Sequence, residues 1–347
     1  MNSYPPRSTP DEAAMKPDVP KTTTARHSRA AGTLAGLALL AACAGAFAQA
    51  YPVRPVQIIV PFPPGGSLDA LVRTVAQQMG ERWNVPVVVD NRAGASGMIG
   101  LNAAAKAAPD GYTLAAVANS FVANTLLRQD MPYDAFKDFA AVSLLGSVPF
   151  VVTASTGLPV NSVRELADYS KRQPGRLTYS SGGTGTMSHL GGEMFKRATG
   201  IEATHVPYRG QAPALTDVVA GQVSFTMGNL PEVLPYAQAG KVKTLAILTA
   251  SRSALRPDIP TLKEAGYAQL ETGSWYGLVA PAGTPPAVVG KIQETVAAIL
   301  RQPAVHDKLV QQGFEVVGNT PAEFGAFMRD EAAAYRKVID AAGIKTE

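Results

Sequence analysis

Glycine-rich and hydroxyl-bearing loops are the features of this sequence best able to do chemistry. Three of them follow a predicted strand: residues 61–67, 118–120 and 182–186. In an open parallel sheet, ligands bind outside the carboxyl ends of the strands, where free N–H groups at helix N-termini attract anions. Any one loop alone is better explained as an ordinary turn. Three such loops together favour a binding site for an anion.

Motifs for other chemistries are missing or have the wrong spacing. The glycines of residues 94–100 do not follow the dinucleotide-binding pattern, and the sequence contains neither a phosphate loop nor a G-x-S-x-G turn. His189, His205 and His306 have no metal-ligand spacing, so we expect no metal and no cofactor. We expect His189 either to donate a hydrogen bond near loop 182–186 or to satisfy a helix-end carbonyl. A Ser–His–Asp triad stays open, because its members meet only in space. An exported α/β enzyme, such as a hydrolase, is therefore the alternative function.

Composition and charge are those of an ordinary folded protein. Of 347 residues, 46% are hydrophobic and 17% charged, and the formal net charge is +4. The basic residues form no stripe, which argues against a nucleic-acid partner.

The first fifty residues have the layout of a secretory signal. Arg26 and Arg29 precede an apolar run over residues 30–48, which ends in the small-residue exit Ala48-Gln49-Ala50. We predict that residues 1–50 are a signal peptide and that the mature protein is periplasmic. Cys43, the only cysteine, lies in a segment that also resembles a lipoprotein cleavage box, so lipid anchoring is the alternative.

The mature chain repeats units of strand, loop and helix, which predicts an α/β fold. The first strands are expected at residues 56–60, 86–90 and 112–117, with Ser67 as the cap of the first helix. A second series of units follows Pro149, and the chain crosses back near Gly273. We therefore expect one lobe from residues 51–148 and 274–347, and a second from residues 149–273.

The order of motifs along the mature chain resembles a known family. It resembles the substrate-binding proteins of tripartite tricarboxylate transporters, the Bug family of periplasmic solute-binding proteins. The motifs that carry the likeness are Tyr51-Pro52-x-Arg54-Pro55, Pro61-Phe62-Pro63-Pro64-Gly65-Gly66-x-x-Asp69, Asp90-Asn91-Arg92-Ala93-Gly94-Ala95, Pro109-Asp110-Gly111-Tyr112-Thr113, Gly183-Thr184-Gly185-Thr186-Met187-Ser188-His189-Leu190, His205-Val206-Pro207-Tyr208-Arg209-Gly210 and Trp275-Tyr276-Gly277-Leu278.

The resemblance implies a type II-like, two-lobed periplasmic binding protein (a Venus flytrap) with a parallel-rich sheet in each lobe. It implies capture of a small carboxylate, such as a di- or tricarboxylate or an aromatic carboxylate, held largely by backbone groups and water. It also implies a monomer that is not an enzyme and that serves the membrane permease subunits of a transporter or a sensor kinase. By position, the expected ligand-binding residues are Phe62, Pro63, Gly65, Gly66, Ser67, Asp69, Asn119, Ser120, Thr184, Gly185, Thr186, His189 and Tyr208.

One segment departs from the family pattern. Where relatives often carry an acidic residue, residues 224–229 read Ser-Phe-Thr-Met-Gly-Asn. A missing carboxylate would matter most for ligands with an amino group, so we expect a simple carboxylic acid rather than an amino acid.

Overall fold

One long strand, β4 (Phe139–Ser155), takes part in both β-sheets of the computed structural model, which describes residues 51–342. Its first part pairs with β9, and from Phe150 onward it pairs with β7 and β8. The change of partner falls between Pro149 and Phe150. The predicted signal peptide, with Cys43, lies outside the described residues.

The first sheet combines a parallel set of strands with antiparallel neighbours. β1 pairs in parallel with β2 and β3, and β9 runs antiparallel between β3 and β4. Its remaining strands, besides the first part of β4, are β1 (Val56–Val60), β2 (Val87–Asn91), β3 (Thr113–Ala118), β9 (Gly273–Pro281) and β10 (Glu315–Val316).

The second sheet follows the same plan. β5 pairs in parallel with β6 and β7, while β7 and β8 run antiparallel to β4. These strands are β5 (Thr178–Ser181), β6 (Thr204–Pro207), β7 (Phe225–Asn229) and β8 (Val242–Ile247). Both sheets therefore keep the parallel units that the sequence predicted, with β4 and β9 as antiparallel links.

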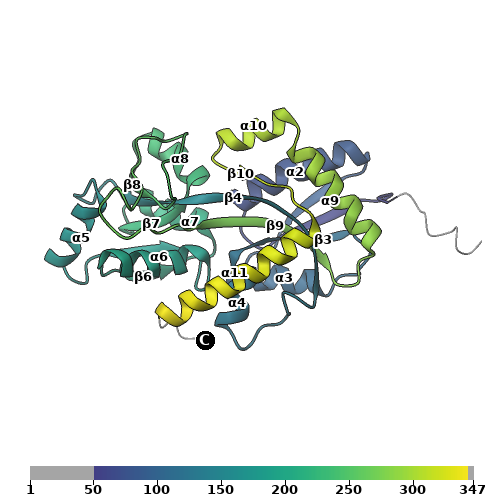
Figure 1. The fold of residues 1–347 in the computed structure, drawn as a ribbon, viewed down its shortest axis with the longest axis horizontal. Helices are drawn as coiled ribbons and strands as arrows, with labels where there is room; N and C mark the ends of the chain where they lie inside the picture. The colour runs from purple at the N-terminus through teal and green to yellow at the C-terminus, as the bar shows by residue number, and fades with distance from the viewer. Residues whose placement is uncertain (1–50, 343–347) are drawn as a thin grey trace, which may run out of the picture. The chain divides into compact units, whose positions relative to one another are not determined.

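Helices pack around each sheet, as Figure 1 shows. The first group is α2 (Ser67–Trp83), the 3-10 turn η2 (Ala95–Gly97), α3 (Met98–Ala105), α4 (Asn119–Leu127), α9 (Pro286–Leu300), α10 (Pro303–Gln311) and α11 (Pro321–Ala342). The second group is α5 (Val163–Arg172), α6 (Met187–Thr199), α7 (Gln211–Val219) and α8 (Leu230–Gln238). α9 contacts α2 and β4, as expected of a C-terminal segment on the first sheet, but α11 contacts α6 as well as α4.

Close backbone approach fixes the point where the chain passes between the sheets. Gly273 pairs with Pro149 at the end of the β4–β9 ladder. A Cβ atom at Gly273 would lie 2.2 Å from the carbonyl oxygen of Val148, so no other residue fits there. Proline at 149 donates no N–H bond, which suits a position where a strand changes its partner.

Several expectations from the sequence were wrong in detail. The second series of units, expected after Pro149, begins within the much longer strand β4. The loop expected at residues 118–120 is the end of β3 and the start of α4, and α7 and α8 were not predicted. Ser67 is not the cap of α2: the N-cap is Gly66, and no side-chain cap bond comes from it. Apolar alternation along residues 139–149 is weak, because this part of β4 is buried on both faces in many places.

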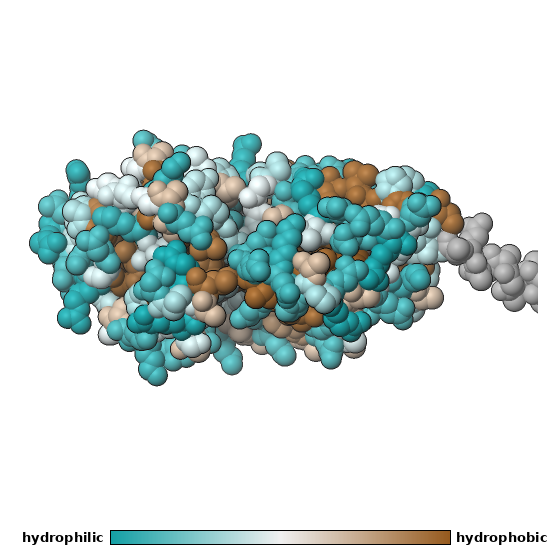
Figure 2. Space-filling view, turned by 90° about the horizontal axis from the view of Figure 1, so that it is seen from above, coloured by the Kyte–Doolittle hydropathy of each residue, from teal (hydrophilic) through white to brown (hydrophobic). Residues whose placement is uncertain are grey.

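The surface carries separate hydrophobic patches on a mainly hydrophilic face (Figure 2). The exposed large apolar side chains include Val88, Ile99 and Phe136. Among the described residues, none of the helices has the length and apolar character needed to cross a membrane.

Exchange of Gly277 in β9 for alanine should destabilise the fold. The added Cβ would lie 2.2 Å from Cζ of Phe324, whose ring is fully buried and has little room to move. Overpacking of this kind costs about 1–3 kcal/mol. Gly290→Ala, in helix α9 with no neighbour within 4 Å, is the matched control and should be neutral or stabilising. Urea unfolding measures both; equal midpoints for the two variants would refute the argument.

Candidate functional site

Four helix N-termini meet at one cavity between the two sheets. The first residues of α2, α4, α6 and α7 all line it: Ser67, Asn119, Met187 and Gln211. The first N–H groups of a helix have no intrahelical partner, and the helix dipole adds about half a positive charge at that end. Helix N-termini gathered in this way favour an anion over a cation.

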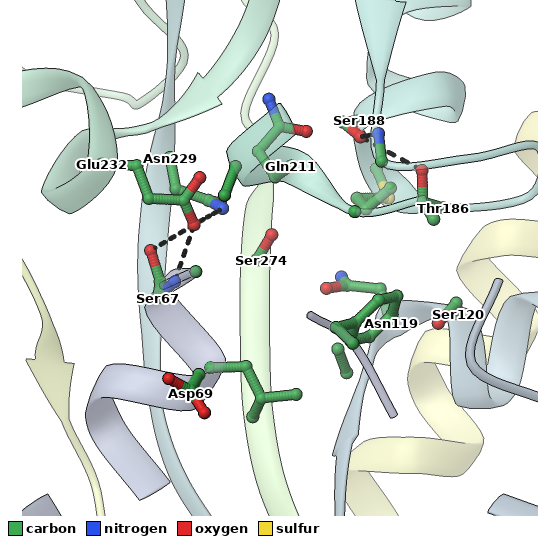
Figure 3. A pocket seen from close by; sticks show the side chains of 18 of the residues that line it. Ser67, Asp69, Asn119, Ser120, Thr186, Ser188, Gln211, Asn229, Glu232 and Ser274 are labelled. Carbon is green, nitrogen blue, oxygen red and sulfur yellow. Dashed lines mark hydrogen bonds between the residues drawn. The ribbon is translucent and has the colours of Figure 1, made fainter. Parts of the chain in front are cut away.

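The lining contains no lysine, arginine or histidine among the described residues. Its polar side chains include Ser120, Thr186, Ser188 and Ser274, which Figure 3 shows around the opening. Its apolar side chains are chiefly Phe62, Leu68, Phe150, Met187 and Tyr276. The cavity volume of about 80 Å³ leaves room for several water molecules or one small acid, at roughly 10–15 Å³ per water.

Most of the predicted ligand-binding residues line this cavity. They are Phe62, Pro63, Gly66, Ser67, Asp69, Asn119, Ser120 and Thr186. The side chain of Asn119 is already engaged, because its Oδ1 accepts from the Trp275 N–H and its Nδ2 donates to the Tyr335 hydroxyl. The Asn119 side chain therefore joins the start of α4 to β9 and α11.

The other predicted residues lie elsewhere. Thr184 and Tyr208 line a neighbouring pocket that shares Phe62 and Gly182 with the cavity. Gly65 and Gly185 line neither pocket; both have positive φ, so they shape the loops rather than face the cavity. Their role in ligand binding stays a prediction.

His189 contacts loop 182–186, and His205 contacts the strand that precedes this loop. His189 accepts a 3.3 Å hydrogen bond at Nδ1 from the Gly185 N–H, so it contacts loop 182–186 as an acceptor rather than the expected donor. Its ring stacks on His205 at 4.2 Å between centroids. His205 in turn shares a 2.6 Å hydrogen bond with Ser181, which is fully buried and does not line the cavity. The Ser181–His205 pair is therefore not placed to attack a ligand.

The Asp69 carboxylate forms hydrogen bonds within its own loop and to β2. Its carboxylate accepts from the Gly65 N–H at 3.1 Å, from Arg73 Nε at 2.9 Å and from Asn91 Nδ2 at 2.9 Å. Burial opposes ionisation, but these hydrogen bonds and the Arg73 charge outweigh it and hold the pKa of Asp69 below its usual value. The charge is neutralised by Arg73, and the bonds fix residues 61–69 against β2.

Glu232, which the sequence analysis overlooked, is the second acidic residue of the cavity. Its Oε1 accepts from the Ser67 N–H and the Ser67 hydroxyl, both at 2.7 Å, and from Asn229 Nδ2 at 2.9 Å (Figure 3). Its Oε2 is out of contact with solvent and has no partner within the described residues, although the residue as a whole is half-buried. Burial raises the pKa of Glu232, and the three hydrogen bonds offset this only in part.

Three polar residues of the cavity were missed because they lie at the starts of helices that the sequence analysis did not predict. Gln211, Asn229 and Glu232 stand at the starts of α7 and α8. The dipeptide Leu230-Pro231 places proline at the start of a helix, which could have indicated α8. The segment expected to lack a carboxylate is thus followed, three residues later, by one that lines the cavity.

Two sheets with a ligand-sized cavity lined from both define the class of two-lobed solute-binding proteins. The sequence model of the "Tripartite tricarboxylate transporter family receptor" matches residues 71–344, and the chain belongs to this family. Its members are binding proteins and not enzymes.

Named relatives agree with this assignment. "Protein BugT" of Bordetella pertussis is 36% identical over 86% of this chain and 92% of its own length. An R. palustris structure "with adipate" is 38% identical, with a TM-score of 0.83 over 85% of this chain and 99% of that one. The structure of MatC from Rhodopseudomonas palustris "with bound malate" is 31% identical, with a TM-score of 0.79 over 83% of this chain and 100% of that one.

Acidification should destabilise the fold through His205. Burial and then repulsion from His189 lower its pKa from 6.5 to about 4, so the unfolded chain binds a proton between these values that the folded protein does not. Stability is therefore lost as pH falls through 6.5. The His205 side chain is half-buried, so we expect a loss of a few degrees in Tm at most between pH 7 and 5.

Thermal unfolding of His205→Gln tests this expectation. The variant should show a shallower fall in Tm over that pH range than the wild type. His306→Gln, at an exposed histidine of α10, is the control and should follow the wild type. Parallel pH profiles for wild type and His205→Gln would contradict the assignment.

Proposed function

We propose that this protein is exported to the periplasm and captures a small organic acid between its two lobes. The acid is a small carboxylate, and it is passed to the permease subunits of a tripartite transporter or reported to a sensor. The observation that carries the proposal is the meeting of four helix N-termini at a cavity whose lining, within residues 51–342, has no cationic side chain. The adipate and malate in the two R. palustris structures support a carboxylate ligand.

Hydrogen bonds between the two halves of the chain support capture by closure. Ser67 bonds to Glu232, and the Ser96 hydroxyl donates to the Thr184 carbonyl at 2.7 Å. A ligand that touches both halves does so only when they are together, so it shifts the population toward the closed state. We place the lobes at residues 51–148 with 274–347, and 149–273, because β4 and β9 link the sheets near Pro149 and Gly273.

Export rests on the leader sequence. Residues 1–50 carry the basic flank, apolar run and small-residue exit of a signal peptide. N-terminal sequencing of the mature protein distinguishes cleavage after Ala50 from lipidation at Cys43.

A carboxylate should stabilise the mature protein against heat. A ligand at about one hundred times its Kd adds about 2.7 kcal/mol, which raises Tm by several degrees. Differential scanning fluorimetry against three- to eight-carbon carboxylic acids, with the matching alcohols as controls, measures this. No stabilising acid, together with no acid retained on the purified protein by mass spectrometry, would count against the proposal.

Filling the cavity should reduce this stabilisation. Ser274 of β9 stands near the centre of the opening in Figure 3, and a phenylalanine there would take up the ligand's space. The steric cost of about 1–3 kcal/mol corresponds to a roughly ten- to hundredfold weaker affinity. Ser251→Phe, at an exposed loop position, is the matched control and should bind normally. Calorimetric titration that shows equal affinity for both variants would place the ligand elsewhere.

A further inference from the structure

Glu232 places a carboxyl group of the protein at an anion position of the cavity. Helix α8, which carries it, packs on β4, β7 and β8, whereas Ser67 begins α2, which packs on β1, β2 and β3. The hydrogen bonds from the Ser67 N–H and hydroxyl to Oε1, both 2.7 Å, therefore join the two halves of the chain. One of the four converging helix N-termini is already satisfied by Glu232.

The orientation of the neighbouring amide confirms that Oε1 is an acceptor. Asn229 donates its Nδ2 to the same oxygen at 2.9 Å, and the Ser67 N–H can only donate. Three donors thus converge on Oε1. Oε2 has no contact with solvent and no partner within the described residues.

Nothing cationic offsets this carboxyl group across the cavity. The lining has no lysine, arginine or histidine in the described part of the chain, and Arg73 is committed to Asp69 on the far side of its loop. A ligand with one carboxylate can use the N-termini of α4, α6 and α7. A second carboxylate would meet Glu232 in a poorly solvated space without a counter-charge.

From this geometry, and given the proposed function, we infer that Glu232 restricts the site to ligands with a single carboxylate and no second anionic group in the remainder. The apolar lining suits that remainder: Phe62, Leu68, Phe150, Met187 and Tyr276 would face it. The inference separates this chain from the R. palustris proteins solved with adipate and malate, both of which are dicarboxylates.

Glu232→Gln tests the inference, because glutamine keeps the shape and the acceptor for Ser67 but removes the charge. Isothermal titration with matched acids, such as hexanoate and adipate, compares one carboxylate with two on the same carbon chain. The wild type should bind the monocarboxylate at least about tenfold more tightly, since like charges in a desolvated site discriminate strongly. The variant should gain about tenfold in affinity for the dicarboxylate and change little for the monocarboxylate.

A control and a second measurement make the result decisive. Glu294→Gln, an exposed glutamate of α9, removes the same charge away from the cavity and should keep the wild-type preference. Lower pH should favour the dicarboxylate more in the wild type than in Glu232→Gln, because protonation of Glu232, whose pKa burial raises, removes a repelling charge only in the wild type. Asp69 stays ionised beside Arg73, and burial raises the pKa of Tyr276 and keeps it neutral, so neither cavity residue titrates in this range.

Two outcomes would overturn the inference: wild-type protein that binds the dicarboxylate as tightly as its matched monocarboxylate, or an unchanged preference in Glu232→Gln. Binding of no acid by either protein would instead reject the proposed function.

Discussion

The structure depends on a constraint that every α-helix carries: its first N–H groups need acceptors from outside the helix. Here four helices begin at the same cavity, so their unsatisfied donors are gathered in one place. A buried donor without a partner costs about 1–3 kcal/mol, which makes an empty, closed cavity unfavourable. Glu232 supplies an acceptor for α2, and a ligand carboxylate would supply one for the others. The affinity for a carboxylate and the closure of the two lobes would thus both come from satisfying these N–H groups.

The topology explains why the helices begin there. α2 follows β1, α4 follows β3, α6 follows β5 and α7 follows β6, so each starts at the carboxyl end of a strand from a parallel pair. In parallel sheets these ends lie on one edge. Because β4 belongs to both sheets and β9 runs beside it as far as Pro149, the two edges face a common space. Gly273 is required at that junction by the nearby Val148 carbonyl.

The sequence could predict the features that depend on local patterns. The loop at residues 61–69 and the start of α6 have glycines and hydroxyls that signal a turn before a helix, and both line the cavity. It could not predict α7 and α8, because both are short helices of nine residues that carry proline, at position 213 in α7 and at positions 231 and 235 in α8. Nor could it predict that Glu232 replaces Ser67 as the acceptor for α2, since 165 residues separate the two.

Asp69 and Glu232 show how environment decides what the same functional group does. Both line the cavity, yet Asp69 is paired with Arg73 and bonded to Gly65. Its charge is therefore neutralised, and its hydrogen bond stabilises the conformation of the loop. Glu232 accepts hydrogen bonds but has no cationic partner among the described residues, and burial raises its pKa. A carboxylate that is paired with a cation adds no net charge to the cavity. An unpaired carboxylate adds a negative charge, which repels a negative group of the ligand. Because the described lining has no lysine or arginine, that unpaired group, rather than the number of backbone donors, would limit how many negative charges a ligand can bring.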